Sequence, residues 1–372
     1  MKLSLLQENF STALENTSRF VSARAQLPIL SNILLATDNG QLKLTATNLE
    51  LGISCWIGAK IEQEGSMTIP AKEITEFVSY LSAGRLDLEL DSKNLFTITS
   101  SKAQSTFTTT PPDDFPNLPP INPDQAIDLD MSLLRDSVNQ IAFSAATDDT
   151  RPILTAVLCS FTSNSLTLVA TDGFRLSLKE IKLVNPISLP TDQMTLLIPG
   201  KSLSEVVKLA KNDKKLTLGL SNDEHQLVFV LDGLELVSRL IEGDYPEYRR
   251  IIPSAFSTRL LINKEELSQA VKIASVFARE SANVIRLNIK DSHIEISANA
   301  PQIGQNKATV EAKVEGGSLD IAFNYKFISD FLSVCKGEEL TLELNEPLTP
   351  ALFRDQSDPQ FTHIIMPVRL QD

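Results

Sequence analysis

The residues of this chain that could do chemistry are few and far apart. Asp148 and Asp149 stand side by side, and paired carboxylates can hold a metal ion. A solvated turn ahead of a strand is the favoured interpretation of that pair. The three histidines, His225, His293 and His363, fall in separate strand or turn contexts, and none is close in sequence to a plausible nucleophile. Catalysis by the two aspartates and a histidine is therefore a minor hypothesis.

Motifs that bind nucleotide phosphates do not occur either. The sequence contains neither G-x-x-x-x-G-K-[ST] nor G-x-G-x-x-G, the two glycine-rich loops that cradle phosphates at a helix start. The Asp172-Gly173 pair is typical of a hairpin turn, because Asp-Gly supplies the backbone freedom that such a turn needs. We therefore predict a non-catalytic protein with no cofactor and no metal.

Lysine and arginine side chains offer a different chemistry, which is contact with phosphate. On any single predicted helix they are typical of a solvated face, but a set that recurs in equivalent positions predicts one positive surface for sequence-independent contacts. These residues, on or just beyond the predicted helices, are Arg19, Arg24, Lys72, Arg135, Lys201, Lys208, Lys211, Lys214, Lys215, Lys264, Lys272, Lys326 and Lys336. The net charge of −13 argues against DNA contact over the whole surface, but it leaves room for a local basic face.

Composition sets the broad class of the protein. The 372 residues allow two or three domains, and 42% hydrophobic with 22% charged residues is typical of a soluble globular chain. The sequence has no run of about 18 apolar residues that would predict a membrane span, and its start is unlike a signal peptide. Cys55, Cys159 and Cys335 are odd in number and widely separated, so we expect a reducing, cytoplasmic location.

The elements that carry these residues are repeated along the chain. Leu86–Leu90, Leu216–Leu220 and Leu340–Leu344 share one alternating Leu-x-Leu-x-Leu pattern, at spacings of 130 and 124 residues. A period that long predicts repeated domains rather than solenoid units. We expect domains at 1–121, 122–253 and 254–372, joined through the proline-rich Pro111–Pro120 and through Glu242–Tyr248.

Each third of the chain carries the same order of predicted elements. A helix comes first, with an apolar stripe such as Phe10, Ala13, Leu14 and Thr17. A strand, a hairpin, a second helix and the Leu-x-Leu-x-Leu strand follow. The predicted first strands are Pro28–Leu35, Pro152–Leu158 and Asn283–Ile289. Two helices on mainly antiparallel strands make each copy an α+β domain, and the six helices would share one surface.

Four ordered motifs make the chain resemble the bacterial DNA polymerase III β subunit family. They are Leu27–Leu30, Val169–Leu176, Tyr245–Arg250 and Met366–Leu370. The resemblance implies a DNA clamp fold of three repeated domains per chain. It also implies that two chains close head-to-tail into a six-domain ring, with helices lining the hole and sheet outside. Such a sliding clamp encircles duplex DNA without sequence specificity and performs no chemistry.

The resemblance also implies a pocket that receives short peptides from partners. Its walls would be Leu154, Thr171, Gly173, Phe174, Arg175, Leu176, Pro246, Arg250, Ile251, Asn324, Phe327, Leu348, Ile364, Met366, Pro367, Val368, Arg369 and Leu370. Many relatives carry histidine where this chain has Phe174, which would make the pocket entrance more apolar. The implied partners are the replicative DNA polymerase catalytic subunit, an ATP-dependent clamp loader, repair polymerases, mismatch-repair proteins and ligase.

Two further sets of residues follow from the resemblance. Arg24, Lys72 and Lys201 match positions that approach duplex DNA, and Phe107, Val276 and Phe277 match the interface of the homodimer. The turn that contains Asp148 and Asp149 would lie near DNA, although its acidic residues make direct phosphate contact doubtful. A peptide-binding scaffold of the same fold that does not encircle DNA is the alternative hypothesis.

Overall fold

The structure is a computed structural model that describes residues 1–22, 27–123, 126–148, 150–189, 191–210, 214–221 and 225–369. Contacts between residues divide the chain into two compact units. The first unit consists of Met1–Met131 and Glu205–Leu240, and the second consists of Ser132–Ser204 and Ile241–Asp372. In the part of the chain that is described, no helix combines the length and the apolar character needed to cross a membrane.

The first unit contains two antiparallel sheets. A five-stranded sheet has the order β5-β1-β7-β8-β9, and an eight-stranded sheet has the order β10-β15-β16-β17-β4-β3-β2-β6. The strands of the five-stranded sheet are β1 (Lys2–Leu6), β5 (Lys60–Gln63), β7 (Arg85–Leu90), β8 (Leu95–Thr99) and β9 (Gln104–Thr108). Those of the eight-stranded sheet are β2 (Asn32–Asp38), β3 (Gln41–Thr47), β4 (Leu51–Gly58), β6 (Ser66–Pro70), β10 (Ile127–Asp130), β15 (Lys215–Leu220), β16 (Gln226–Leu231) and β17 (Leu234–Arg239).

The second unit contains one twelve-stranded sheet with the order β14-β11-β12-β13-β25-β24-β23-β18-β21-β20-β19-β22. Its first group of strands is β11 (Ala156–Thr162), β12 (Ser165–Thr171), β13 (Arg175–Lys182) and β14 (Gln193–Pro199). The others are β18 (Thr258–Asn263), β19 (Val284–Ile289), β20 (His293–Ala300), β21 (Gly304–Gly316), β22 (Leu319–Asn324), β23 (Glu339–Leu344), β24 (Ala351–Asp355) and β25 (Phe361–Ile365).

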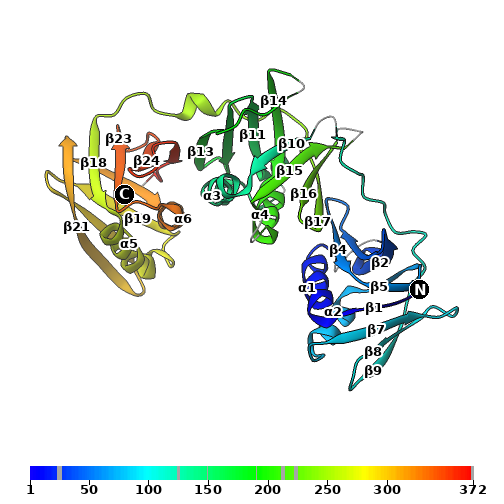
Figure 1. The fold of residues 1–372 in the computed structure, drawn as a ribbon. Helices are drawn as coiled ribbons and strands as arrows, with labels where there is room; N and C mark the ends of the chain where they lie inside the picture. The colour runs from blue at the N-terminus through cyan, green and yellow to red at the C-terminus, as the bar shows by residue number, and fades with distance from the viewer. Residues whose placement is uncertain are drawn as a thin grey trace. The chain divides into compact units, whose positions relative to one another are not determined.

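The helices pack on these sheets through the predicted apolar stripes. They are α1 (Gln7–Ser18), α2 (Ala71–Ser79), α3 (Met131–Ile141), α4 (Gly200–Leu209), α5 (Lys264–Ala278) and α6 (Tyr325–Val334). Helices α1 and α2 lie side by side, as do α5 and α6 (Figure 1). In α1 the stripe Phe10, Ala13, Leu14 and Thr17 is buried. Because each helix buries one face on sheet, the predicted α+β class is confirmed.

The start of α5 shows why the second unit folds locally as it does. The side chain of Asn263 accepts hydrogen bonds from the backbone N–H groups of Glu265 and Glu266, which satisfies donors that a helix start leaves without partners. The two glutamates also place negative charge at the positive end of the helix dipole. Leu267, Val271 and neighbouring alanines then bury one face of α5.

Two predicted strands begin later than expected. Pro28–Ser31 and Pro152–Thr155 form single 3-10 turns, and strands β2 and β11 begin only after them. A proline at the first position holds φ near the helical value and needs no N–H partner. The apolar character of these residues was therefore a correct sign of burial for Leu30 and Leu154, but not of strand.

Strand pairing also joins the predicted domains edge to edge. In the first unit, β17 pairs with β4, with Val237 opposite Gly52. In the second unit, β25 pairs with β13, with Ile364 opposite Leu176. The same kind of strand is used each time, because β17 and β25 are each the last strand of a repeat, and β4 and β13 each follow the first hairpin. Equivalent strands of the repeat therefore form both joints between domains. We call this pattern the joining rule.

Candidate functional site

A candidate site lies where β13 and β25 meet in the second unit. A cavity of about 640 Å³ opens there. Its walls combine the start of β13, the end of β25, the segment that precedes β18 and the connection between β23 and β24. The lining residues are Thr171, Gly173, Arg175, Leu176, Arg250, Ile251, Ile252, Pro253, Ser254, Ala255, Asn345, Thr349, Pro350, Ile364 and Met366. A cavity of this size with apolar walls and a few polar groups fits a short stretch of peptide.

The turn between β12 and β13 shapes one wall of this cavity. Thr171 accepts a hydrogen bond from the N–H of Gly173 at 3.0 Å and donates its hydroxyl to the carbonyl of Arg175 at 2.6 Å. Asp172 accepts from the N–H groups of Phe174 and Arg175 at 2.9 and 3.0 Å. Gly173 has a φ of +90°, which a residue with a side chain rarely adopts. The predicted hairpin turn is therefore closed by its own side chains.

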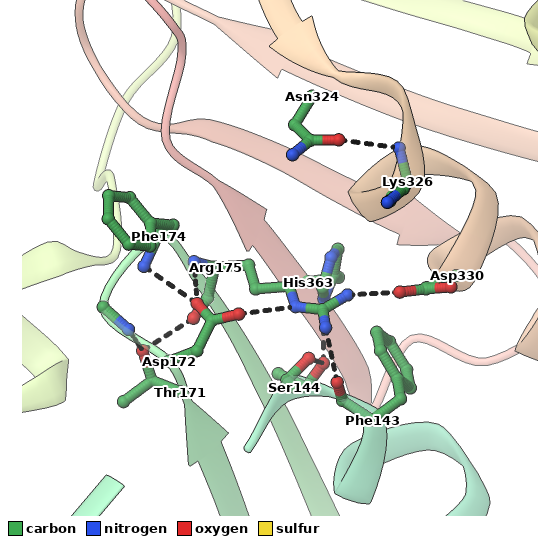
Figure 2. Close-up of polar contacts among 12 residues, drawn as sticks. Phe143, Ser144, Thr171, Asp172, Phe174, Arg175, Asn324, Lys326, Asp330 and His363 are labelled. Atoms are coloured by element: carbon green, nitrogen blue, oxygen red, sulfur yellow. Dashed lines mark hydrogen bonds and ion pairs between the residues drawn. The ribbon is translucent and has the colours of Figure 1, made fainter. Parts of the chain in front are cut away.

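Arg175 is the most heavily engaged charged residue at the site (Figure 2). Its guanidinium donates to Asp172 at 3.0 Å, to Asp330 of α6 at 2.5 Å and to the carbonyl of Phe143 at 2.6 Å. The same group lies 4.6 Å from the ring centroid of Phe327, within cation–π range. Only 11% of the side chain is exposed. Because its charge is already paired, Arg175 serves mainly to hold the cavity wall against α6.

His363 lies beside this network and is fully buried in β25. Its Nδ1 shares a hydrogen bond of 2.8 Å with the hydroxyl of Ser177, and its ring stacks on Phe331 at a centroid distance of 5.4 Å. Burial, with a smaller contribution from the positive charge of Arg175, lowers the pKa of His363 to about 3. The imidazole is therefore neutral near pH 7 and acts as a core residue rather than as an acid or base.

Further ion pairs join the two parts of the twelve-stranded sheet. Lys179 of β13 pairs with Asp358, which also accepts a hydrogen bond from Gln140 at 3.0 Å. Lys336 pairs with Asp136 of α3. The Lys179 side chain is only 10% exposed, so its charge needs that partner. These pairs hold the surroundings of the cavity together through side chains as well as through the strand ladder.

Eight of the predicted wall residues line the cavity together. They are Thr171, Gly173, Arg175, Leu176, Arg250, Ile251, Ile364 and Met366. Met366 also donates its N–H to the carbonyl of Phe174 at 2.8 Å, and Val368 donates to Ala322 at 2.8 Å. The end of the chain up to these residues is therefore held against the cavity. That these residues bind a peptide stays a prediction.

Other predicted wall residues lie outside the cavity lining. Phe327 packs on Arg175, and Asn324 caps α6 by accepting from the N–H of Lys326. Phe174 and Leu348 are exposed, at 57% and 52%. The remaining ones are Leu154, which is buried near Gly173, and Pro246, Pro367, Val368 and Arg369. Leu370 lies outside the described residues.

Sequence reasoning missed seven of the cavity residues. Ile252, Pro253, Ser254 and Ala255 follow directly on Ile251, and Asn345, Thr349 and Pro350 flank Leu348. Adjacency to predicted wall residues was the available signal. The partners of Arg175 were missed as well, since Asp330 and Phe143 lie far from it in sequence and only packing brings them close.

The predicted DNA-contacting lysines occupy equivalent helix positions. Lys72 and Lys201 are exposed, and each is the second residue of its helix, α2 or α4. Lys326 holds the same position in α6. Arg24 lies outside the described residues. A lysine at this end of a helix lies at the positive end of the helix dipole, where its charge destabilises the helix. The same positive charge and dipole favour a bound anion at all three positions.

Asp148 of the acidic pair lies in a turn, where its side chain accepts a hydrogen bond from the N–H of Thr150. Hydrogen bonds from the hydroxyl and N–H of Thr150 lower the pKa of the Asp148 carboxyl, as expected for a turn that is closed by its own side chain. Asp149 lies outside the described residues. Among the residues that are described, no group of three or more His, Cys, Asp or Glu side chains could hold a metal ion.

The predicted interface residues lie on or beside β9 and the start of β21. Phe107 of β9 packs edge-to-face on Phe77 of α2, with ring centroids 5.2 Å apart. Val276 of α5 is 55% exposed, and the ring of Phe277 lies beside Gly304, the first residue of β21. That these residues form an interface between two copies stays a prediction.

The fold and its joining rule define a three-domain clamp, and comparison with known proteins identifies its family. Models of the DNA polymerase III beta subunit match the chain along its length: the N-terminal domain at residues 1–119, the central domain at 128–247 and the C-terminal domain at 249–369. The chain therefore belongs to the DNA polymerase III beta subunit family. As a member it is a non-catalytic subunit, and the minor enzyme hypothesis is not favoured.

Similar proteins and solved structures agree with this assignment. The chain is 32% identical to the beta sliding clamp of Bacillus subtilis over 381 residues, covering 99% of this chain and 100% of the relative. It is 30% identical to the beta sliding clamp of Staphylococcus aureus over 379 residues, with 99% of each covered. The crystal structure of the Bacillus subtilis DNA polymerase sliding clamp superposes with a TM-score of 0.93 at 30% identity, covering 100% of both chains. The DNA polymerase III beta subunit of Thermotoga maritima gives 0.91 at 27% identity, again with 100% of both chains covered.

Proposed function

We infer that this chain is a DNA polymerase processivity factor, a sliding clamp that acts as a homodimer and encircles duplex DNA. The observation that carries the inference is the rule of strand pairing. At both joints within the chain, the last strand of one repeat pairs with the strand after the first hairpin of the preceding repeat. A third joint of the same kind would use the last strand of the first repeat, which is β9, and a strand of another chain.

The strand that would complete the third joint belongs to the last repeat. Residues 304–311 of β21 pair with β20 on one side, and β9 pairs with β8. No described strand pairs with the other edge of either. An unpaired edge is a template for another chain, so we propose that β9 of one copy pairs with β21 of the other. Two copies related in this way would close head-to-tail into six domains.

Apolar side chains support the same interface. Ile273 and Val276 on α5 are 43% and 55% exposed, and Ile303, just before β21, is 56% exposed. On the other edge, Phe77 and Phe107 form an aromatic pair. Exposed apolar groups of this size beside a free strand edge fit a contact between copies.

Contact with DNA is proposed for the starts of the helices. Lys72 and Lys201 would approach the phosphates, together with Arg24, and the relatives' description as sliding clamps supports this role. Such contacts are weak and carry no sequence information. A closed ring needs no strong contact, because topology alone would keep it on the duplex. The net charge of −13 is compatible with that mechanism, since few basic side chains are required.

The cavity beside β25 is proposed as the peptide pocket. The aliphatic walls from Leu176, Ile251, Ile364 and Met366 would take apolar side chains of an extended peptide. Methionine adapts to different ligand shapes, which suits a pocket shared among partners. The proposed partners are the replicative polymerase catalytic subunit, the ATP-dependent loader, repair polymerases, mismatch-repair proteins and ligase, all in the cytoplasm. We also keep the domain borders 1–121, 122–253 and 254–372 as a proposal.

Retention on circular DNA tests the proposed function. After loading onto a nicked circular plasmid, the protein should stay with the DNA during gel filtration, and it should be lost once the plasmid is cut by a restriction enzyme. A topological link explains that difference, because a ring can slide off free ends. Equal retention on the circle and on the cut plasmid would contradict encirclement. Failure to be retained on either would favour the scaffold that binds peptides only.

A further inference from the structure

At the joint between β17 and β4, the connecting chain packs over two strand glycines. We call residues Pro116–Asn122 the crossing segment. A side chain at Gly52 of β4 would begin 2.5 Å from a methyl carbon of Leu118, and one at Gly219 of β15 would begin 2.9 Å from Ile121. Neither glycine has a positive φ. The missing side chains, rather than the backbone conformation, therefore give Leu118 and Ile121 the space that they occupy.

The crossing segment is also held through its backbone. Asn122 donates its N–H to the carbonyl of Leu220 at 2.9 Å, and Ile121 forms a β-bridge with Ser221. Ahead of the segment, Thr110 exchanges backbone hydrogen bonds with Thr68 at 2.8 and 3.0 Å. The chain on both sides of Leu118 is thus tied to sheet, and between these ties it crosses the face of the sheet over the interior strands β4 and β15.

The corresponding joint in the second unit is built differently. Both joints share one hydrogen bond beyond the paired strands, from Arg239 to Glu50 at 2.9 Å and from Met366 to Phe174 at 2.8 Å. Leu176 takes the place of Gly52, 124 residues further along the chain. At the second joint the connecting chain also packs beside Leu176, through Tyr245, Tyr248 and Ile252, but it leaves the cavity of about 640 Å³ open. At the first joint the side chain of Leu118 lies directly over Gly52.

We propose that Gly52 and Gly219 form a second peptide-binding site, specific for an extended, proline-rich apolar segment, and that the chain fills this site with its own crossing segment. Leu118 and Ile121 are the two anchors, one on each glycine. The prolines Pro116, Pro119 and Pro120 lower the entropy that docking costs. Because the crossing segment is part of the same chain, its effective concentration at the site is roughly millimolar. It therefore outcompetes a peptide that is free in solution. Because the crossing segment fills this site, each chain keeps only the cavity beside β25 for partners. This last consequence rests on the proposed function.

Alanine substitution at two glycines of one strand tests the docking. Gly52→Ala places a methyl group against Leu118 and should displace it. Gly58→Ala is the matched control, because nothing lies within 4 Å of a side chain there. Hydrogen exchange in a fragment covering residues 110–123 should become faster by on the order of tenfold in Gly52→Ala only. The double variant Gly52→Ala with Leu118→Ala should lose less hydrogen-exchange protection than the sum of the losses in the two single variants, because the two side chains are in contact. Equal exchange in both glycine variants would overturn the proposal.

Binding in trans tests whether the site accepts a ligand. The probe is a fluorescently labelled peptide with the sequence of residues 113–122, added to the full-length protein without DNA. The variant Leu118→Ser with Ile121→Ser should bind one equivalent more than the unchanged protein, and a peptide with serine at the same two positions should not bind. No additional equivalent in a variant with an unchanged circular dichroism spectrum would overturn the site. This readout is independent of retention on circular DNA, so the two proposals fail separately.

Discussion

At the scale of residues, the site is defined by which charges are already paired. The sequence motif around Arg175 predicted a pocket wall, and Arg175 does line the cavity. Its guanidinium is nevertheless occupied by Asp172, Asp330 and the carbonyl of Phe143. An arginine with three such partners is costly to detach. The residues left for ligand contact are therefore mainly apolar, such as Ile251 and Met366.

Ile251 offers the clearest test of the pocket, because 39% of its side chain is exposed. Ile251→Asp should weaken binding of a short apolar peptide from the replicative polymerase by about tenfold or more, since burial of an isoleucine contributes about 1.5–3 kcal/mol. Fluorescence anisotropy with a labelled peptide measures the change. Leu27→Asp is the control, because Leu27 is exposed at 52% and belongs to the other unit. Unchanged affinity in Ile251→Asp would refute the pocket assignment.

At the scale of elements, strand edges decide how the chain is assembled. Helices α1 to α6 bury their stripes locally, and those stripes were readable from the sequence. The joints depend instead on which edges are left free. Pairing of β17 with β4 and of β25 with β13 uses two pairs of edges. Beside the free edge of β21, α5 exposes Ile273 and Val276, so this helix belongs to the proposed interface.

A charge at that interface should separate the two copies. Val276→Asp should weaken the dimer by about 2–4 kcal/mol for each of its interfaces, because a carboxylate would be buried without a partner. Size-exclusion chromatography with light scattering at low micromolar concentration measures the result. Val184→Asp makes the same change at a valine that is 85% exposed, and it should leave the dimer intact. A Val276→Asp protein that remains dimeric would exclude this surface from the interface.

At the scale of the whole molecule, charge and repetition act together. The chain carries 47 acidic and 34 basic residues, so repulsion from DNA is the general expectation. The exception is a lysine repeated at the second position of α2, α4 and α6. One such lysine would be an ordinary surface residue. For three equivalent ones we propose that each would contact a phosphate, with no base recognition.

Charge reversal at two of these lysines tests that surface. The protein with Lys72→Glu and Lys201→Glu should bind a short linear duplex more weakly. The slope of log affinity against log salt should fall by about one for each phosphate contact removed. The control protein, with Lys60→Glu and Lys93→Glu, has the same net charge but changes β5 and the turn after β7. An identical salt slope in the two proteins would contradict the proposed role of the helix starts.

The sequence by itself determined the threefold repeat, the α+β class and the helix stripes. These follow from local periodicity, because a buried face needs apolar residues at regular spacing. The hairpin turn at Asp172-Gly173 was also readable, since the required backbone freedom belongs to particular residue types. The chemistry that is absent was equally apparent, as the histidines and the acidic pair are dispersed along the chain.

Only the tertiary structure decided how those elements meet. It brought Asp330 and Phe143 to Arg175, placed Ile252–Ala255 in the cavity wall and converted Pro28–Ser31 and Pro152–Thr155 into 3-10 turns. It also packed Leu118 over Gly52, which no pattern predicts. Contacts between distant segments depend on the shape and volume that side chains fill together, and a one-dimensional spacing carries no record of that volume. The repeat could therefore be recognised from sequence, whereas the difference between its two joints could not.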